Sequence, residues 1–165
     1  MKGFLFVNPR SGSTGAADLL LLREEARRRR IAVHVLQPDD DAEALARETD
    51  AAALGVAGGD GTLAAVATVA IDRGLPFVCV PFGTRNHFAR DLGLDTDEPV
   101  AALDAFGSSE RRVDVGRVDG RLFLNNVSLG LYARLVHRRE RHRFRREGFA
   151  SLRALCWSSS SVMRR

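Results

Sequence analysis

Several residue types are scarce in this 165-residue chain, and their scarcity excludes some classes of protein. Its two cysteines, Cys79 and Cys156, stand neither in a CxxC pair nor at a metal-ligand spacing, so we expect no disulfide framework and no zinc site. Aromatic residues make up only 7% of the chain, and no pattern of a known RNA- or DNA-binding motif is visible. We therefore expect no nucleic-acid partner.

Long hydrophobic runs are also missing. The apolar run near the N-terminus, residues 3–7, is too short for the core of a signal peptide. Residues 51–71 contain a single charge, Asp60, but alanine and glycine dominate this stretch and glycines interrupt its middle. A buried strand, loop and helix explain it better than a membrane span. We expect a cytoplasmic protein, with peripheral attachment to a membrane as a further option.

The remaining composition is that of a globular domain with an excess of positive charge. The chain is 45% hydrophobic and 28% charged, which is enough apolar material for one domain with a core. Its net charge of +4 comes from arginine, because Lys2 is the only lysine. This charge favours anionic partners such as a nucleotide, a nucleic acid or an acidic lipid, without choosing among them.

Short apolar runs alternate with amphipathic segments along most of the chain. We expect strands at residues 2–7, 31–36, 52–57 and 77–80, and helices at residues 16–30, 42–49 and 63–73, with a short helix ending at Asp91 and another between Pro99 and Gly107. Apolar strands that alternate with helices predict an α/β fold, a mostly parallel sheet with helices on both faces. Asp119-Gly120, between residues 111–118 and 121–128, predicts a short antiparallel hairpin.

One glycine-rich loop, Gly58-Gly59-Asp60-Gly61-Thr62, follows a predicted strand and opens a predicted helix. Backbone N–H groups at the start of a helix suit phosphate, and glycine lets a phosphate chain approach the backbone. Asp60 would repel phosphates unless a cation lay between them, so we interpret it as acting through Mg²⁺, with Thr62 as a helix cap or a phosphate donor. The alternative is a tight turn in which Asp60 only caps the helix.

Two more loops follow predicted strands and would lie at the same edge of the sheet. Residues 8–12 follow the first strand and residues 81–86 follow the fourth, and each offers glycine together with hydroxyl or amide groups. Open α/β sheets bind ligands at the carboxyl ends of their strands. The three loops are therefore predicted to line one nucleotide cleft.

In these loops the sequence resembles the diacylglycerol kinase catalytic domain family, which includes sphingosine kinases and bacterial lipid kinases. The matching segments are residues 7–12, 58–62 and 81–93, with later similarity at residues 112–116 and 123–130. Glycine-glycine-aspartate loops also occur in NAD kinases and phosphofructokinases, which share this type of nucleotide-binding domain. Residues 81–93 are similar to the lipid-kinase form.

The resemblance implies a fold, a reaction and a set of site residues. The fold is that of the N-terminal domain of NAD kinases and diacylglycerol kinases, and the reaction moves the γ-phosphate of ATP to a lipid hydroxyl, of diacylglycerol first and of a sphingoid base second. It also implies Asn86 near the cleft and Asp114 in an ionic network near Mg²⁺. The implied ATP contacts are Asn8, Ser11, Gly12, Gly58, Gly59, Asp60, Gly61, Thr62 and Thr84.

The chain also departs from the family pattern. Ala64 replaces a polar residue, and Arg85 and His87 stand where small and acidic residues are frequent. Family members continue into a mostly β domain that supplies the catalytic carboxylate and much of the lipid pocket. We therefore expect an incomplete enzyme with no identifiable general base, consisting of an ATP-binding domain at residues 1–133 and the start of a second domain at residues 134–165. A partner in trans would be the other source of that domain.

The C-terminal segment is rich in arginine, and two interpretations of it remain. Residues 134–146 would be either a cationic surface facing anionic lipid at a membrane or a solvated linker towards a missing domain, and we favour the linker. Two other functions also remain. One is a non-catalytic nucleotide-binding fragment or subunit, and the other is an NAD kinase-like enzyme.

Overall fold

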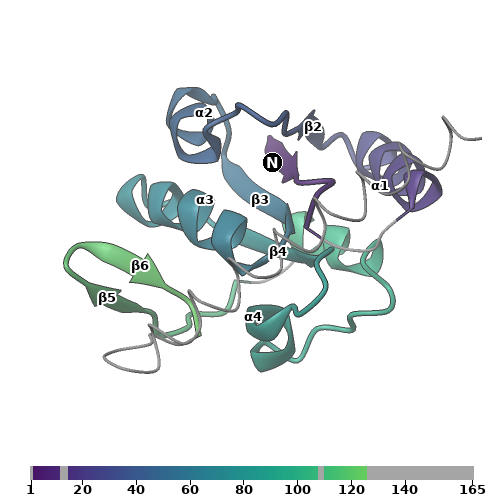
Figure 1. Cartoon of the computed structure of the whole chain (residues 1–165). Coiled ribbons are helices and arrows are strands. Elements are labelled where there is room, and N and C mark those ends of the chain that lie inside the picture. The colour runs from purple at the N-terminus through teal and green to yellow at the C-terminus, as the bar shows by residue number, and fades with distance from the viewer. Residues whose placement is uncertain (1, 12–14, 108–109, 126–165) are drawn as a thin grey trace, which may run out of the picture. The chain divides into compact units, whose positions relative to one another are not determined.

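The structure is a computed structural model that describes residues 2–11, 15–107 and 110–125. It is an α/β fold with a parallel sheet between two layers of helices, as predicted (Figure 1). Within the described ranges, no helix is long and apolar enough to cross a membrane. The arginine-rich segment and the boundary predicted at residue 133 lie outside these ranges.

The elements are β1 (Gly3–Val7), α1 (Ala16–Arg28), β2 (Ala32–Val35), α2 (Ala42–Glu48), β3 (Ala53–Gly58), α3 (Asp60–Asp72), β4 (Phe77–Pro81), α4 (His87–Asp91), η1 (Ala101–Gly107), β5 (Gly116–Val118) and β6 (Arg121–Phe123).

The order of the strands places a switch point at the middle of the sheet. The order is β2-β1-β3-β4, and all of these strands run parallel. Leu5 of β1 lies between Val33 of β2 and Gly55 of β3. From β1 the chain moves outwards to β2 and then returns to the other side of β1 at β3. Ligands of open α/β sheets bind at the carboxyl ends of strands where the order reverses in this way.

Each face of the sheet has its own core because alternate residues of a strand point to opposite faces. Phe6 and Val56 pack with α2, α3 and α4, whereas Leu5 and Ala57 pack with α1 and η1. The central strands β1 and β3 are buried on both sides, which explains why they appear as almost continuous apolar runs in the sequence.

Phe106 of η1 packs directly on the backbone of the two central strands. A Cβ at Gly3 would lie 2.6 Å from the Phe106 ring, and one at Gly55 would lie 2.5 Å from it. The ring is 7% exposed. The element that carries it was predicted as a helix bracketed by Pro99 and Gly107; it is a 3-10 helix of seven residues that includes Gly107.

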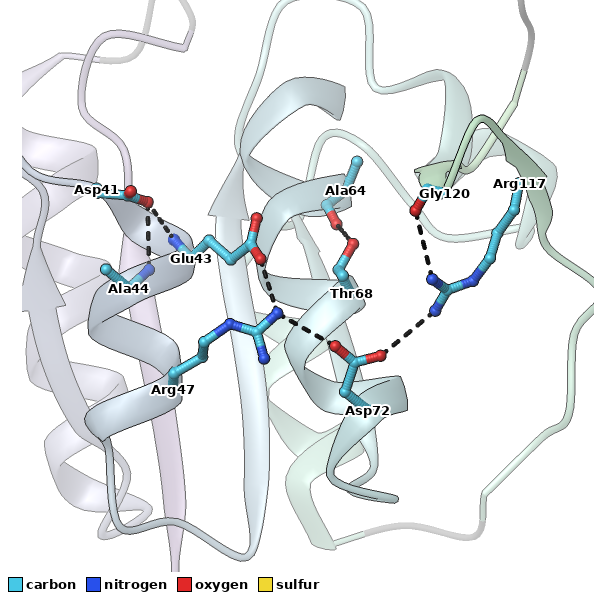
Figure 2. Close-up of polar contacts among 9 residues, drawn as sticks. All are labelled: Asp41, Glu43, Ala44, Arg47, Ala64, Thr68, Asp72, Arg117 and Gly120. Atoms are coloured by element: carbon cyan, nitrogen blue, oxygen red, sulfur yellow. Dashed lines mark hydrogen bonds and ion pairs between the residues drawn. The ribbon is translucent and has the colours of Figure 1, made fainter.

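The predicted hairpin forms, but its strands are shorter than expected. Asp119 and Gly120 both have positive φ, 49° and 77°, as a two-residue type I′ turn requires. Only three residues on each side pair, in a sheet separate from the parallel one. Asp72, at the end of α3, accepts hydrogen bonds from Arg47 of α2 at 3.2 Å and from Arg117 of β5 at 3.5 Å (Figure 2). This carboxylate links α2, α3 and the hairpin.

Candidate functional site

The three glycine-containing loops meet at the carboxyl edge of the sheet, as the sequence predicted. The N–H of Asn8, after β1, donates to the carbonyl of Ala57 in β3 at 2.8 Å. The N–H of Thr84, after β4, donates to the carbonyl of Ser11 at 3.1 Å, and the Thr84 hydroxyl donates to the same oxygen at 3.4 Å. Backbone hydrogen bonds therefore hold the first loop against β3 and the third loop against the first.

Helix α3 begins at Asp60, three residues earlier than predicted, so the glycine loop supplies its first turn. Gly59 is the N-cap in an extended conformation, and no side chain caps the helix. The first N–H groups of a helix have no partner within the helix and carry a partial positive charge. The N–H groups of Asp60, Gly61 and Thr62 are thus placed to bind an anion.

Thr62 does not take the first of the two roles predicted for it, that of a helix cap, and its role as a phosphate donor stays a prediction. Its Oγ1 accepts a hydrogen bond from Nδ2 of Asn8 at 2.9 Å, which ties the first loop to the first turn of α3. The other side-chain atom of Asn8, Oδ1, accepts from the N–H of Arg10 at 3.1 Å. Thr62 therefore does not cap α3, and Asn8 is fixed at both ends of its amide group.

Two glycines, Gly83 and Gly58, allow the loops to approach closely, and a third, Gly61, faces open space among the described residues. A Cβ at Gly83 would lie 2.8 Å from Oδ1 of Asn86, 3.1 Å from Cα of Gly59 and 3.3 Å from the carbonyl oxygen of Gly58. A Cβ at Gly58 would lie 3.3 Å from the Asn8 side chain. At Gly61, by contrast, a Cβ would meet nothing within 4 Å. Packing among the described residues does not explain the glycine at position 61.

Asn86 shapes the third loop from inside. It is buried, with 6% of its surface exposed, and it adopts a left-handed backbone conformation with φ 45°. Its Oδ1 accepts the N–H of Gly83 at 2.8 Å, which closes the turn that brings Gly83 against the glycine loop. Asparagine tolerates this conformation better than most residues do. Asn86 thus supports the third loop, and its predicted place near a nucleotide cleft stays a prediction.

Asp60 does cap a helix, but not its own. Its Oδ1 accepts the N–H of Phe88 in α4 at 3.3 Å, so it links the glycine loop to the residues after the third loop. Cys79 of β4 is buried near it. Burial, and to a lesser extent the negative charge of Asp60, raise the pKa of the Cys79 thiol to about 12.

The site offers little for a metal ion by itself. No cluster of three or more histidine, cysteine, aspartate or glutamate residues that could hold a metal is present in the described part of the chain. Asp60 is the only acidic residue in the three loops. Mg²⁺ is commonly held by one or two carboxylates together with phosphate oxygens and water. The Asp60 carboxylate, with Oδ2 unbonded among the described residues, fits Mg²⁺ that arrives with phosphates.

The structure brings some of the predicted site residues together but not all of them. Those of the three loops come together, except that Gly12 lies outside the described residues. Asp114 is exposed and has no hydrogen bond or ion pair with the described residues, so its role near Mg²⁺ stays a prediction. Sequence reasoning missed Gly83, which makes the tightest approach to the glycine loop. The only signal was its position in a loop after a strand.

Comparison with known proteins gives consistent results. Residues 2–118 match the family model described as the diacylglycerol kinase catalytic domain. A protein of Pseudomonas aeruginosa, described as "Probable lipid kinase YegS-like", is 40% identical over 113 residues, which cover 66% of this chain and 37% of that protein. A "Diacylglycerol kinase" of Bacillus subtilis is 34% identical over 98 residues, covering 58% of this chain and 32% of that one.

Solved structures agree with the sequence comparison. The crystal structure of a diacylglycerol kinase from Bacillus anthracis str. Sterne superposes with a TM-score of 0.64 at 27% identity. The match covers 75% of this chain and 46% of that structure. The chain spans about a third of the length of the curated relatives it matches.

Proposed function

Because this chain belongs to the diacylglycerol kinase catalytic domain family, we propose that it forms the ATP-binding part of a lipid kinase. Kinases of this kind transfer the γ-phosphate of ATP to a lipid hydroxyl. The observation that carries the proposal is the convergence of three loops around the uncapped first turn of α3, at the switch point of the sheet. The acceptor we propose is diacylglycerol, with a sphingoid base as the second choice.

In this proposal the residues of the chain bind and orient the triphosphate. The N–H groups of the first turn of α3 would donate to phosphate oxygens, and the open space beside Gly61 leaves room for them. Asn8 and Thr84 hold the neighbouring loops in place, so little ordering is needed when the nucleotide binds. Asp60 would hold Mg²⁺, whose charge would offset the negative charge of the phosphates.

We also propose that the three loops do not supply the general base. Asp60 is their only carboxylate, and one of its oxygens already accepts the N–H of Phe88. A base that removes the proton of a lipid hydroxyl must reach that hydroxyl directly or through one water. Another part of the protein, or a partner, would provide it.

The experiment is a titration of the purified chain with Mg²⁺-ATP by calorimetry, followed by an assay of phosphate transfer to diacylglycerol in mixed micelles. ATP binding without transfer supports an ATP-binding part without a base. Transfer would show that this chain contains a base, and absence of ATP binding would remove the proposed function. Binding of NAD as well as ATP would instead favour an NAD kinase-like enzyme.

Asp60→Asn tests the role of the carboxylate. The asparagine oxygen still accepts the N–H of Phe88, so we expect the fold to persist, while affinity for Mg²⁺-ATP falls about tenfold, or about 1.4 kcal/mol. Asp39→Asn, an exposed site with the same loss of charge, is the matched control and should leave affinity unchanged. If both variants bind Mg²⁺-ATP as the parent chain does, Asp60 has no role in binding the metal.

A further inference from the structure

The four consecutive leucines of α1, residues 19–22, point to all sides of the helix, because successive helical residues are rotated by about 100°. Leu22 is completely buried and packs with Ala26 against the sheet, whereas Leu20 is 63% exposed. Leu20 therefore adds little to the core of this chain. It lies on the side of the helix that continues to Arg23 and Arg27.

This side of α1 forms one wall of a surface groove. Leu20, Arg23 and Arg27 line it from the helix, and Ile31 and Val33 line it from the segment that contains β2. Ile31 is 5% exposed and Val33 is partly buried, so the floor of the groove is apolar. The arginines make its rim cationic.

The positive charge of the groove is not neutralised within the described part of the chain. Arg28 and Glu24 also line it and pair with each other at 3.2 Å, and Arg28 pairs with Glu25 at 2.8 Å. Arg23 and Arg27 have no acidic partner among the described residues. Two uncompensated cations beside an apolar floor complement a ligand that is both acidic and apolar.

The groove runs beside an open edge of the sheet. Among the strands of the described ranges, β2 pairs with β1 on one side only. The N–H of Leu36 donates to Val7 at 2.8 Å, and backbone groups of a strand alternate in direction, so those of Val33 face the open edge. The carbonyl of Val35 on that edge accepts from the Gln37 side chain at 3.0 Å. The backbone of Val33 remains able to pair with an added strand.

We propose that this groove binds an extended acidic segment of a partner protein, which adds to β2 as an edge strand. Every second side chain of that segment would face α1, with acidic residues at Arg23 and Arg27 and an apolar residue on Leu20 and Val33. A second copy of this chain is a poorer occupant. If it paired with β2 about a twofold axis, Arg23 and Arg27 of one copy would face the same arginines of the other, and like charges repel. A flat bilayer would not fill a groove between a helix and a strand.

The test uses the full chain and a fluorescein-labelled peptide of Glu-Thr-Val-Thr repeats, followed by fluorescence anisotropy. In an added strand, glutamate and valine alternate on one face of this peptide. A Glu-Pro-Val-Pro peptide of equal charge lacks every second N–H group, and its prolines favour the polyproline II conformation over a paired strand. We expect the first peptide to bind and the proline peptide to bind at least about tenfold more weakly.

Charge reversal at the groove provides the second measurement. Arg23→Glu with Arg27→Glu should weaken peptide binding about tenfold, because two attractions become repulsions. The matched control is Arg112→Glu with Arg121→Glu, two exposed arginines elsewhere with the same change in net charge, and it should change binding less than about twofold. Far-ultraviolet circular dichroism and the unfolding temperature check that both variants fold.

Three outcomes would overturn the proposal. Equal weakening by the two double variants would show attraction by net charge alone. Equal binding of the two peptides would exclude strand addition. Binding of phosphatidylglycerol vesicles that is lost in the Arg23/Arg27 variant, without binding of the Glu-Thr-Val-Thr peptide, would assign the surface to membranes. None of these results depends on whether the chain binds ATP.

Discussion

At the scale of single residues, the glycines of the site fall into two groups. Gly83 and Gly58 occupy positions with no room for a side chain, because another part of the chain lies within 3.3 Å of where a Cβ would be. A Cβ at Gly61 would have none of the described residues within 4 Å, although Gly61 lies in the first turn of a helix, where alanine would be more favourable. A glycine that packing does not require is best explained by a ligand.

Gly61→Ala should therefore separate binding from stability. We expect the free energy of unfolding to stay the same or to rise by up to about 1 kcal/mol, because alanine favours the helix. Affinity for ATP should fall about tenfold, because the new methyl group occupies space proposed for phosphate. Urea unfolding and calorimetry measure the two quantities, and unchanged affinity would place the phosphates elsewhere.

Gly83→Ala serves as the contrasting variant. Its Cβ would lie 2.8 Å from Oδ1 of Asn86 and 3.1 Å from Cα of Gly59, so loops must separate to accept it. We expect a loss of about 1–3 kcal/mol of stability together with weaker ATP binding. A variant as stable as the parent chain would show that the third loop adapts without cost.

Cys79 predicts how stability depends on alkaline pH. Its thiol has a pKa of about 12 in the folded chain against an ordinary value of 9.0, so between these pH values the folded state keeps a proton that the unfolded state releases. Stability should then fall as the pH rises above about 9, by up to about 1.4 kcal/mol per pH unit. Urea unfolding at pH 8 and pH 10 should show a smaller fall in Cys79→Ala. An identical fall would rule out this thiol as the cause.

At the scale of elements, capping residues show why some helix boundaries were predictable and one was not. Asp41 caps α2, accepting from the N–H groups of Glu43 at 2.9 Å and Ala44 at 3.2 Å, as an aspartate before an alanine-rich segment predicts. Helix α3 has no such signal. Its glycine-rich first turn was predicted as loop, and only Gly59 in an extended conformation marks its start.

Asp41→Ala should destabilise the chain by about 1 kcal/mol, because two N–H groups at the start of α2 lose their acceptor. Asp41→Asn keeps an acceptor oxygen and should recover most of that loss. Thermal unfolding followed by circular dichroism measures both variants. Equal stability of the alanine variant and the parent chain would show that water replaces the cap.

At the scale of the whole described fold, one aromatic ring joins the two central strands to the layer that contains η1. Phe106 lies on Gly3 of β1 and Gly55 of β3, two positions apart in the register of these adjacent strands, and both present only backbone to it. Two of the three loops of the site leave the carboxyl ends of these strands. The spacing of β1 and β3 under the ring therefore also sets the spacing of the loops.

Phe106→Ala should destabilise the fold by about 3–5 kcal/mol, because it leaves a cavity over two glycines. Phe106→Leu refills part of that volume and should cost less. Urea unfolding gives both values, and a loss below about 1 kcal/mol in the alanine variant would mean that the ring contributes little to packing.

Much of this fold could be predicted because its signals are local. Apolar runs, glycine and proline positions and the Asp119-Gly120 turn depend on residues close in sequence, so they determined the order of elements and the three loops after the strands. The tertiary structure alone decided which groups meet. Asn8 bonds Thr62 across 54 positions, and Asp60 accepts the N–H of Phe88 rather than capping its own helix. Such pairings follow from strand order and from the closeness of packed backbones, which no local pattern of residue types records.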